Sequence, residues 1–205
     1  MKTVSHSTGD CPAGTAARDV SGALHEVRWL AREVIGKTMD VPAPLLVSSH
    51  IRQNPAVRDY VTWWMNHPDT GSDFAARTRW LRWLPSALCW RLMSRLGYDG
   101  LVHPHQSDTI VGHIFFQRRR EALHAFSTAA NPQFDGKGFS VVFMLDFVAY
   151  AAQLRGISRA RVGTGGNTVT RRLLNRIKRH EERLGWRVSE DGWVRFFPGK
   201  TDGSS

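Results

Sequence analysis

The sequence contains little cysteine: Cys11 and Cys89 are the only two. Two cysteines are too few for a disulfide framework, and neither has the Cys-x-x-Cys or Cys/His spacing of a zinc site. We therefore expect a reducing, cytoplasmic setting and no metal cofactor.

The sequence also lacks an apolar run long enough to span a membrane. The longest, residues 141–152, is interrupted by Asp146 and is much shorter than the roughly 20 residues that cross a bilayer. Residues 5–10 are polar, where an export signal would have its apolar stretch. The sequence therefore predicts a protein that is neither exported nor integral to a membrane.

Acidic residues are in the minority, with 18 Asp and Glu against 28 Lys and Arg, which gives a net charge of +10. A charge excess of this size attracts anions. The candidates are nucleic acid, an anionic membrane surface, and a phosphate-bearing cofactor or acidic carrier protein. A basic surface without a function is the remaining alternative.

The length of 205 residues and the 41% hydrophobic content suit one substantial core. Residues 1–20 are rich in Gly, Ser, Thr and Ala and have no apolar period. Such a segment cannot recover the entropy of ordering by burial. We expect a flexible tail over 1–20 and one domain over 21–205.

Helical and strand-like patterns alternate along the rest of the chain. Helices are expected at residues 21–36, 55–66, 73–96 with a break at Pro85, 139–154 and 168–184. Strands are expected at residues 44–49, 109–119, 122–130, 159–164, 186–188 and 193–197. This order predicts an α/β fold with helices packed on a mixed sheet.

The sharpest local feature is the turn Gln133-Phe134-Asp135-Gly136-Lys137-Gly138, between a predicted strand and a predicted helix. Glycines let main-chain amides approach a phosphate, and a helix start adds partial positive charge. The spacing fits neither a nucleoside-triphosphate loop nor a dinucleotide fingerprint. Glycine can also stand in such a turn for steric reasons alone.

Gln133-x-x-Gly136-x-Gly138 resembles the signature of the GNAT N-acetyltransferase superfamily. Pro132 precedes the motif, and Asn167 follows the next predicted strand. The chain segments Leu154-Arg155-Gly156 and Leu184-Gly185-Trp186 also match the superfamily's pattern. The resemblance covers about residues 109–197. It implies a mostly antiparallel mixed sheet, helices on both faces, and a V-shaped splay between two parallel central strands.

The resemblance also implies an enzyme, an N-acyltransferase whose donor is acetyl-CoA or a longer acyl-CoA, or an acidic acyl carrier protein. The acceptor would be an amine of a small molecule, peptide or protein, which attacks the thioester directly. Main-chain groups at 126–128 would pair with the pantetheine arm, and those at 134–140 would hold the pyrophosphate. The implied cofactor-binding residues are Phe126, Ser127, Thr128, Gln133, Phe134, Asp135, Gly136, Lys137, Gly138, Phe139, Ser140 and Asn167.

Candidates for the general base are Glu121, His124 and His113, since a neutral imidazole can take a proton from an ammonium near pH 7. An ordinary core or surface histidine is the alternative in each case. Ser127 is a weaker catalytic candidate, because no histidine pairing can be argued for it from the sequence. The superfamily usually has a tyrosine that acts as general acid. The two positions that could correspond to it hold Leu174 and Glu181. The leaving thiolate would then be protonated by another group, for which His180 and water are the candidates, or be released unprotonated.

Two further concentrations of residues remain open. Five tryptophans between residues 63 and 90 are interleaved with arginines, and they could line an acyl or peptide pocket, lie in a membrane interface, or simply pack on the sheet. The basic helix expected at 168–184 could attract coenzyme A, an acidic carrier or nucleic acid, or be a solvated face. The alternative function is a catalytically inactive GNAT-like module that binds nucleic acid or an anionic membrane.

Overall fold

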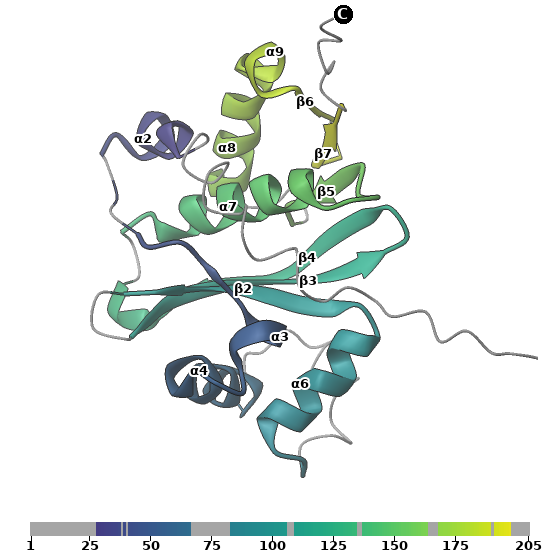
Figure 1. The fold of residues 1–205 in the computed structure, drawn as a ribbon. Helices are drawn as coiled ribbons and strands as arrows, with labels where there is room; N and C mark the ends of the chain where they lie inside the picture. The colour runs from purple at the N-terminus through teal and green to yellow at the C-terminus, as the bar shows by residue number, and fades with distance from the viewer. Residues whose placement is uncertain are drawn as a thin grey trace, which may run out of the picture.

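The computed structural model describes residues 28–37, 39, 41–66, 83–105, 109–134, 137–163, 168–189 and 191–197. The predicted tail at 1–20, the start of the helix predicted from residue 21, and the helical pattern at 73–82 lie outside these ranges. The expected α/β fold is confirmed: a mixed sheet has helices on both faces (Figure 1).

Within the described residues the sheet has seven strands, in the order β1-β2-β3-β4-β5-β7-β6. The strands are β1 (Leu45–Leu46), β2 (Tyr98–Pro104), β3 (Ile110–Arg119), β4 (Ala122–Ala130), β5 (Arg159–Arg161), β6 (Trp186–Val188) and β7 (Trp193–Phe196). All neighbouring pairs are antiparallel except β4 and β5, which are parallel. The predicted mostly antiparallel sheet is therefore confirmed.

The helices form a layer on each face of the sheet. They are α2 (Trp29–Ile35), α3 (Val47–His50), α4 (Pro55–Asn66), α6 (Ser86–Arg95), α7 (Phe139–Gln153), α8 (Thr168–Arg179) and α9 (Glu181–Leu184). Figure 1 shows α7, with α2 and α8 beyond it, above the central strands, and α3, α4 and α6 below them. A short 3-10 helix, η2 (Pro132–Phe134), follows β4.

Several boundaries follow the sequence signals. The side chain of Asn54 accepts a hydrogen bond from the Val57 amide at 3.2 Å, which caps α4 at its start. Helix α6 begins directly after Pro85. The hairpin of β3 and β4 turns at Arg120, which has a φ of 52°. The predicted helix at 55–66, the break at Pro85 and the strand ends at Arg119 and Ala122 are therefore confirmed.

Other predictions need correction. The strand predicted at 44–49 is only two residues long, because Val47–His50 form helix α3, where the amide and hydroxyl of Ser48 bond Asp99. The strand predicted from Arg159 ends at Arg161. The helix predicted at 168–184 breaks at His180, which contacts Glu33 at 3.1 Å.

Strand β2 was not predicted at all. Its sequence contains Gly100, and a β-carbon there would collide with the ring of Phe115 on β3. The strand thus requires glycine at a position where strands usually have a bulkier residue, which weakens the sequence pattern.

The sheet separates two hydrophobic cores. One lies under α7, where Leu123 and Phe147 are fully buried. The other lies under α4 and α6, where Trp90 and Phe115 are fully buried. Among the described helices, none combines the length and the apolar character that crossing a bilayer requires.

Candidate functional site

Strands β4 and β5 run together for only three residue pairs before they part. The last pair joins His124 to Arg161, whereas β4 continues to Ala130. Beyond His124, the β5 side of β4 has no strand partner among the described residues. The V-shaped splay that the GNAT resemblance implied is therefore present at the end of the β4–β5 ladder.

A β-bulge lies on β4 just inside this splay. Phe116 pairs with Ala125 and Phe115 pairs with Ser127, so Phe126 is the extra residue. Phe126 remains 37% exposed, and its ring lies 5.7 Å from that of Tyr98. The bulge sets Ser127 on the sheet face that carries Phe115, which is the face covered by α4.

Ser127 belongs to a hydrogen-bonded chain of three side chains from three elements. Its Oγ lies 2.8 Å from Nε2 of His113 on β3, and the other ring nitrogen of His113 lies 2.9 Å from the hydroxyl of Tyr60 on α4. His113 is fully buried and stacks on Phe115 with 4.1 Å between ring centroids. The structure therefore brings together two of the four predicted catalytic residues and adds Tyr60.

Burial keeps the other two members of this chain, His113 and Tyr60, uncharged. It lowers the pKa of His113 to about 3, with a smaller contribution from His103. It also raises the pKa of Tyr60 above its ordinary value. Because neither group changes charge near pH 7, the chain of hydrogen bonds holds its protons and fixes the Ser127 hydroxyl in place.

The other two predicted catalytic residues lie together at the start of β4. Glu121 and His124 border a surface hollow of about 570 Å³, whose lining is completed by Arg119, Arg120, Ala122, Arg159 and Trp193. The His124 ring meets Trp193 edge to face at 4.8 Å. Burial, followed by the charges of Arg119, Arg161 and Arg159, lowers the pKa of His124. Its imidazole is thus neutral near pH 7.

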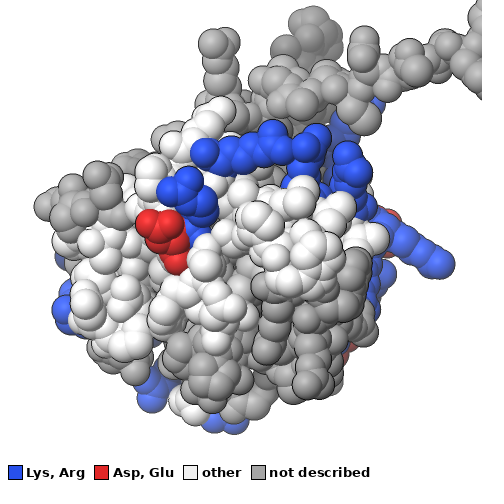
Figure 2. All heavy atoms as spheres, turned by 90° about the horizontal axis from the view of Figure 1, so that it is seen from below, with Lys and Arg blue, Asp and Glu red and all other residues white. Residues whose placement is uncertain are grey.

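Glu121 is much more open to solvent, with a side chain that is 60% exposed and lies 3.8 Å from Arg159. Figure 2, which views the molecule from the side of α4 and α6, shows Lys and Arg side chains gathered along one border, with few acidic side chains among them.

The predicted donor loop follows β4. Gln133 is exposed and Phe134 is half-buried in η2, Lys137 lies over the Phe134 ring at 5.2 Å, and α7 begins at Phe139. Gly138 has a φ of 86°, and no side chain caps the start of α7 within the described residues. The first amides of α7 are therefore available to an anion. Asp135, Gly136 and Asn167 lie outside the described residues.

Gly138 also has a structural reason to be glycine. A β-carbon at this position would lie 3.0 Å from Cγ2 of Ile35 on α2, in a backbone conformation that other residues rarely adopt. A substitution here would thus disturb packing as well as any ligand, so Gly138 is a poor position for testing donor binding.

A second buried polar cluster was missed by the sequence reasoning. Asp146 of α7 is fully buried, with an oxygen 2.9 Å from both Arg28 Nη2 and His103 Nε2. Burial lowers the pKa of His103, and the neighbouring Asp146 partly offsets this decrease. The signal was present in the sequence, since Asp146 interrupts an apolar helix. The sequence signal for Tyr60 was weaker: it lies four residues before Trp64, which places both side chains on the same face of a helix.

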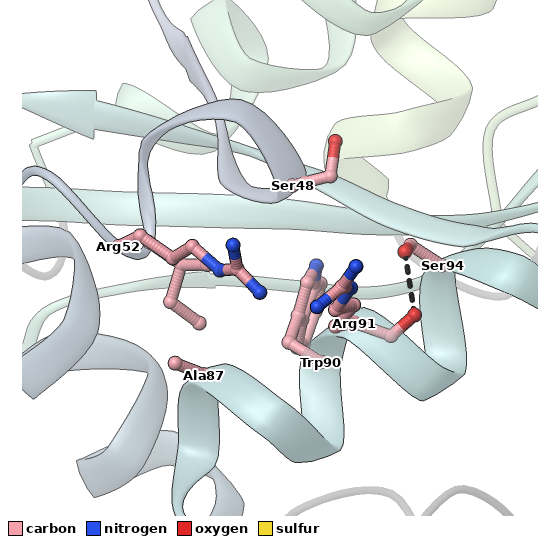
Figure 3. A pocket seen from close by; sticks show the side chains of 7 residues that line it. Ser48, Arg52, Ala87, Trp90, Arg91 and Ser94 are labelled. Atoms are coloured by element: carbon pink, nitrogen blue, oxygen red, sulfur yellow. Dashed lines mark hydrogen bonds between the residues drawn. The ribbon is translucent and has the colours of Figure 1, made fainter.

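A smaller hollow of about 200 Å³ lies between α3 and α6, away from the splay. Figure 3 shows Arg52 and Arg91 reaching toward each other across it, with Trp90 behind them. Trp90 was one of the tryptophans that could line an acyl pocket, but its ring is fully buried in the core under α6.

His180, a candidate for the general acid, contacts Glu33 and Trp29 of α2.

The parallel pair β4 and β5, which splay apart beside a bulge, defines a mixed α/β fold of the kind that the GNAT resemblance implied. Solved acetyltransferases are similar to this chain at low sequence identity. A Trypanosoma brucei acetyltransferase is 17% identical, with 52% of this chain and 74% of that chain covered and a TM-score of 0.37. The PaiA N-acetyltransferase of Thermoplasma acidophilum, solved in complex with coenzyme A, is 13% identical, with 76% and 97% covered and a TM-score of 0.38.

The ribosomal-protein-S18-alanine N-acetyltransferase of Escherichia coli is also 13% identical, with 55% of this chain and 80% of that chain covered and a TM-score of 0.36. No protein-family model and no curated protein matches the chain. The fold assignment stands on the sheet order and on the register of β4 and β5 described above.

Proposed function

We propose that the protein is an N-acyltransferase that moves an acyl group from a coenzyme A-type thioester to an amine. The observation that carries this proposal is the separation of β4 from β5 after His124, beside the bulge at Phe126. An open strand edge inside a sheet can bind an extended ligand through main-chain hydrogen bonds. The amide groups of pantetheine suit such an edge.

Main-chain groups at 126–128 would bind the pantetheine arm, and the uncapped start of α7 would hold the diphosphate. Two observations support this fit: the ladder between β4 and β5 ends at the pair His124 and Arg161, and no described side chain caps α7. The bound thioester would supply the activated acyl group. Its carbonyl would lie beside the bulge, within reach of Ser127.

We assign His124 the role of proton acceptor for the incoming amine. It is the last residue of β4 paired with β5, and it borders an open hollow. Its pKa is lowered by burial and by neighbouring arginines, so the imidazole is in the neutral form that can accept a proton. The amine nitrogen forms a bond to the thioester carbon, the carbon–sulfur bond breaks, and the surplus ammonium proton passes to His124.

Ser127 takes the place of the tyrosine that the superfamily usually supplies. When Tyr60 donates to one nitrogen of His113, the opposite ring N–H donates to Ser127 Oγ, and the serine proton is free to point into the splay. The hydroxyl then donates a hydrogen bond to the departing sulfur. It keeps its own proton, because the low pKa of His113 and the raised pKa of Tyr60 oppose transfer along the chain.

Calorimetric titration with acetyl-, octanoyl- and palmitoyl-CoA tests donor binding without knowledge of the acceptor. We expect saturable binding of at least one thioester. Pantetheine, which lacks the diphosphate, should bind more weakly. A thiol-release assay against a panel of small amines and peptides then tests turnover. Absence of thioester binding, or binding that survives when β4 is disrupted by Thr128→Pro in a folded variant, would refute the proposal.

A further inference from the structure

Four arginines form a row across the sheet. Arg119 pairs with Ala122, Ala122 with Arg159, Arg159 with Arg195, and Arg195 with Arg187. Residues that pair across neighbouring strands project from the same face of a sheet. The register therefore places Arg119, Arg159, Arg195 and Arg187, the arginine row, on one face of β3, β5, β7 and β6.

The next row on this face adds to the positive charge. Gln117 pairs with His124, His124 with Arg161, and Arg161 with Trp193. Neither row contains an acidic residue, and the neighbouring Glu121 lies in the turn before β4. The residues between the rows point to the opposite face, where Leu123, Ala160 and Val194 are fully buried.

Such a row is unfavourable for the folded protein alone. Like charges directly opposite on neighbouring strands destabilise a sheet, and Arg195 has an arginine on both sides. Nε of Arg159 and of Arg161 is buried without a hydrogen-bond partner in the described structure. A feature that violates the usual pairing rules is expected where a site serves a ligand.

Aromatic rings accompany the guanidinium groups. Arg159 and Arg161 lie over the ring of Trp193 at 4.8 and 5.8 Å, and Arg187 lies over the ring of Phe197 at 5.1 Å. Phe197 is 51% exposed. Guanidinium groups match phosphate geometry, and an exposed ring offers a surface on which a base can stack.

We propose that the arginine row binds single-stranded nucleic acid, with phosphates on Arg119, Arg195 and Arg187 and a base stacked on Phe197. The combination of a cationic face with exposed aromatic rings favours this ligand over an acidic protein, which has carboxylates but no bases. The inference does not depend on acyl transfer, because the arginine row needs no thioester to bind phosphates, although Arg119 and Arg159 also line the hollow beside His124.

The test uses the full chain without any thioester and a fluorescently labelled 12-nucleotide single-stranded RNA of mixed sequence, followed by anisotropy between 50 and 200 mM salt. Arg187→Gln combined with Arg195→Gln removes two exposed charges from the row. Arg172→Gln combined with Arg179→Gln removes two exposed charges from α8, on the other side of the sheet, and is the charge-matched control. Phe197→Ala removes the exposed ring.

We expect the row variant to bind RNA at least tenfold more weakly and to lower the slope of log affinity against log salt by about 1.4, since each contact with a single strand contributes about 0.7. The α8 variant should lose less than threefold. Phe197→Ala should weaken RNA binding about fivefold or more while leaving the binding of a heparin fragment, which has no bases, unchanged. Thermal unfolding should show the row variant to be at least as stable as the wild type.

Three results would overturn the proposal. The first is no RNA binding by the wild type at 50 mM salt. The second is an equal loss in the row and α8 variants, which would reflect net charge rather than this face. The third is an unchanged RNA affinity for Phe197→Ala, which would leave no role for a stacked base. None of these results bears on thioester binding, so the two proposals can fail separately.

Discussion

Nε2 of His113 lies 2.8 Å from Oγ of Ser127, although Ser127 pairs in the sheet with Phe115. The bulge at Phe126 makes this contact possible. In a regular ladder continued from the pair Phe116 and Ala125, Ser127 would be opposite Ile114 and would face α7. The extra residue turns the serine toward His113 and, in our proposal, toward the leaving sulfur.

Ser127→Ala should lower kcat by roughly ten- to a hundredfold, because one hydrogen bond to the developing thiolate is lost. KM for the thioester should change little, since in our proposal main-chain groups hold the donor. Ser127→Thr keeps the hydroxyl and should retain more activity. Ser94→Ala on α6 is the matched control and should behave as the wild type. A rise in KM with unchanged kcat would instead assign Ser127 to ground-state binding.

Tyr60→Phe should destabilise the protein by about 1–3 kcal/mol, because it leaves a ring nitrogen of buried His113 without its partner. Urea unfolding measures this change. Tyr150→Phe is the control, since Tyr150 is also buried and its hydroxyl makes no hydrogen bond to another described residue. Equal losses in the two variants would show that the His113 contact contributes nothing specific.

The stability of the protein should decrease as the pH falls from about 6.5 toward 3. Burial lowers the pKa of His113 to about 3, whereas the unfolded chain binds this proton near pH 6.5. The folded state therefore binds fewer protons in this window, and its stability is fully present above pH 6.5. The slope for one such group is about 1.4 kcal/mol per pH unit.

His113→Gln removes this titration, so its free energy of unfolding should depend less on pH than that of the wild type. The comparison requires urea unfolding of both proteins at several pH values between 4 and 7. Parallel pH profiles would contradict the assignment of a neutral, buried His113.

Asp146→Asn should cost about 3–5 kcal/mol of stability, because Arg28 and His103 would lose their buried anionic partner. Asp59→Asn provides the control, since the Arg58 and Asp59 pair is exposed, with side chains 47% and 74% accessible. Its removal should change the free energy of unfolding by less than about 1 kcal/mol. Similar losses at the two positions would mean that burial of Asp146 has no energetic consequence.

The sequence predicted those elements that are marked by local signals. Pro85 marks the start of α6, and charged residues around Arg120 mark the β3–β4 turn. It missed β2, whose glycine is explained only by the ring of Phe115 on the next strand. It also overextended the strand near Val47, where the contact of Ser48 with Asp99 favours a helical turn. Such long-range contacts are not visible in a local pattern.

The same distinction between local signals and long-range contacts applies to the candidate site. The glycine turn and the approximate place of the splay followed from the motif around Gly138. The contact between His113 and Ser127 did not, because it depends on a one-residue bulge that no local pattern announces. Tyr60 lies 53 residues before His113 in the chain, so only the packing of α4 on the sheet brings them together. The arginine row likewise appears only when the strand register is known.

A crystal structure of the protein with bound coenzyme A tests the central claim most directly. We predict the pantetheine arm along β4, with its amides hydrogen-bonded to the main chain at residues 126–128, and the diphosphate against the first amides of α7. The sulfur should lie within hydrogen-bond distance of Ser127 Oγ. Coenzyme A bound away from β4, or a splay closed by protein side chains at saturating ligand, would contradict the account.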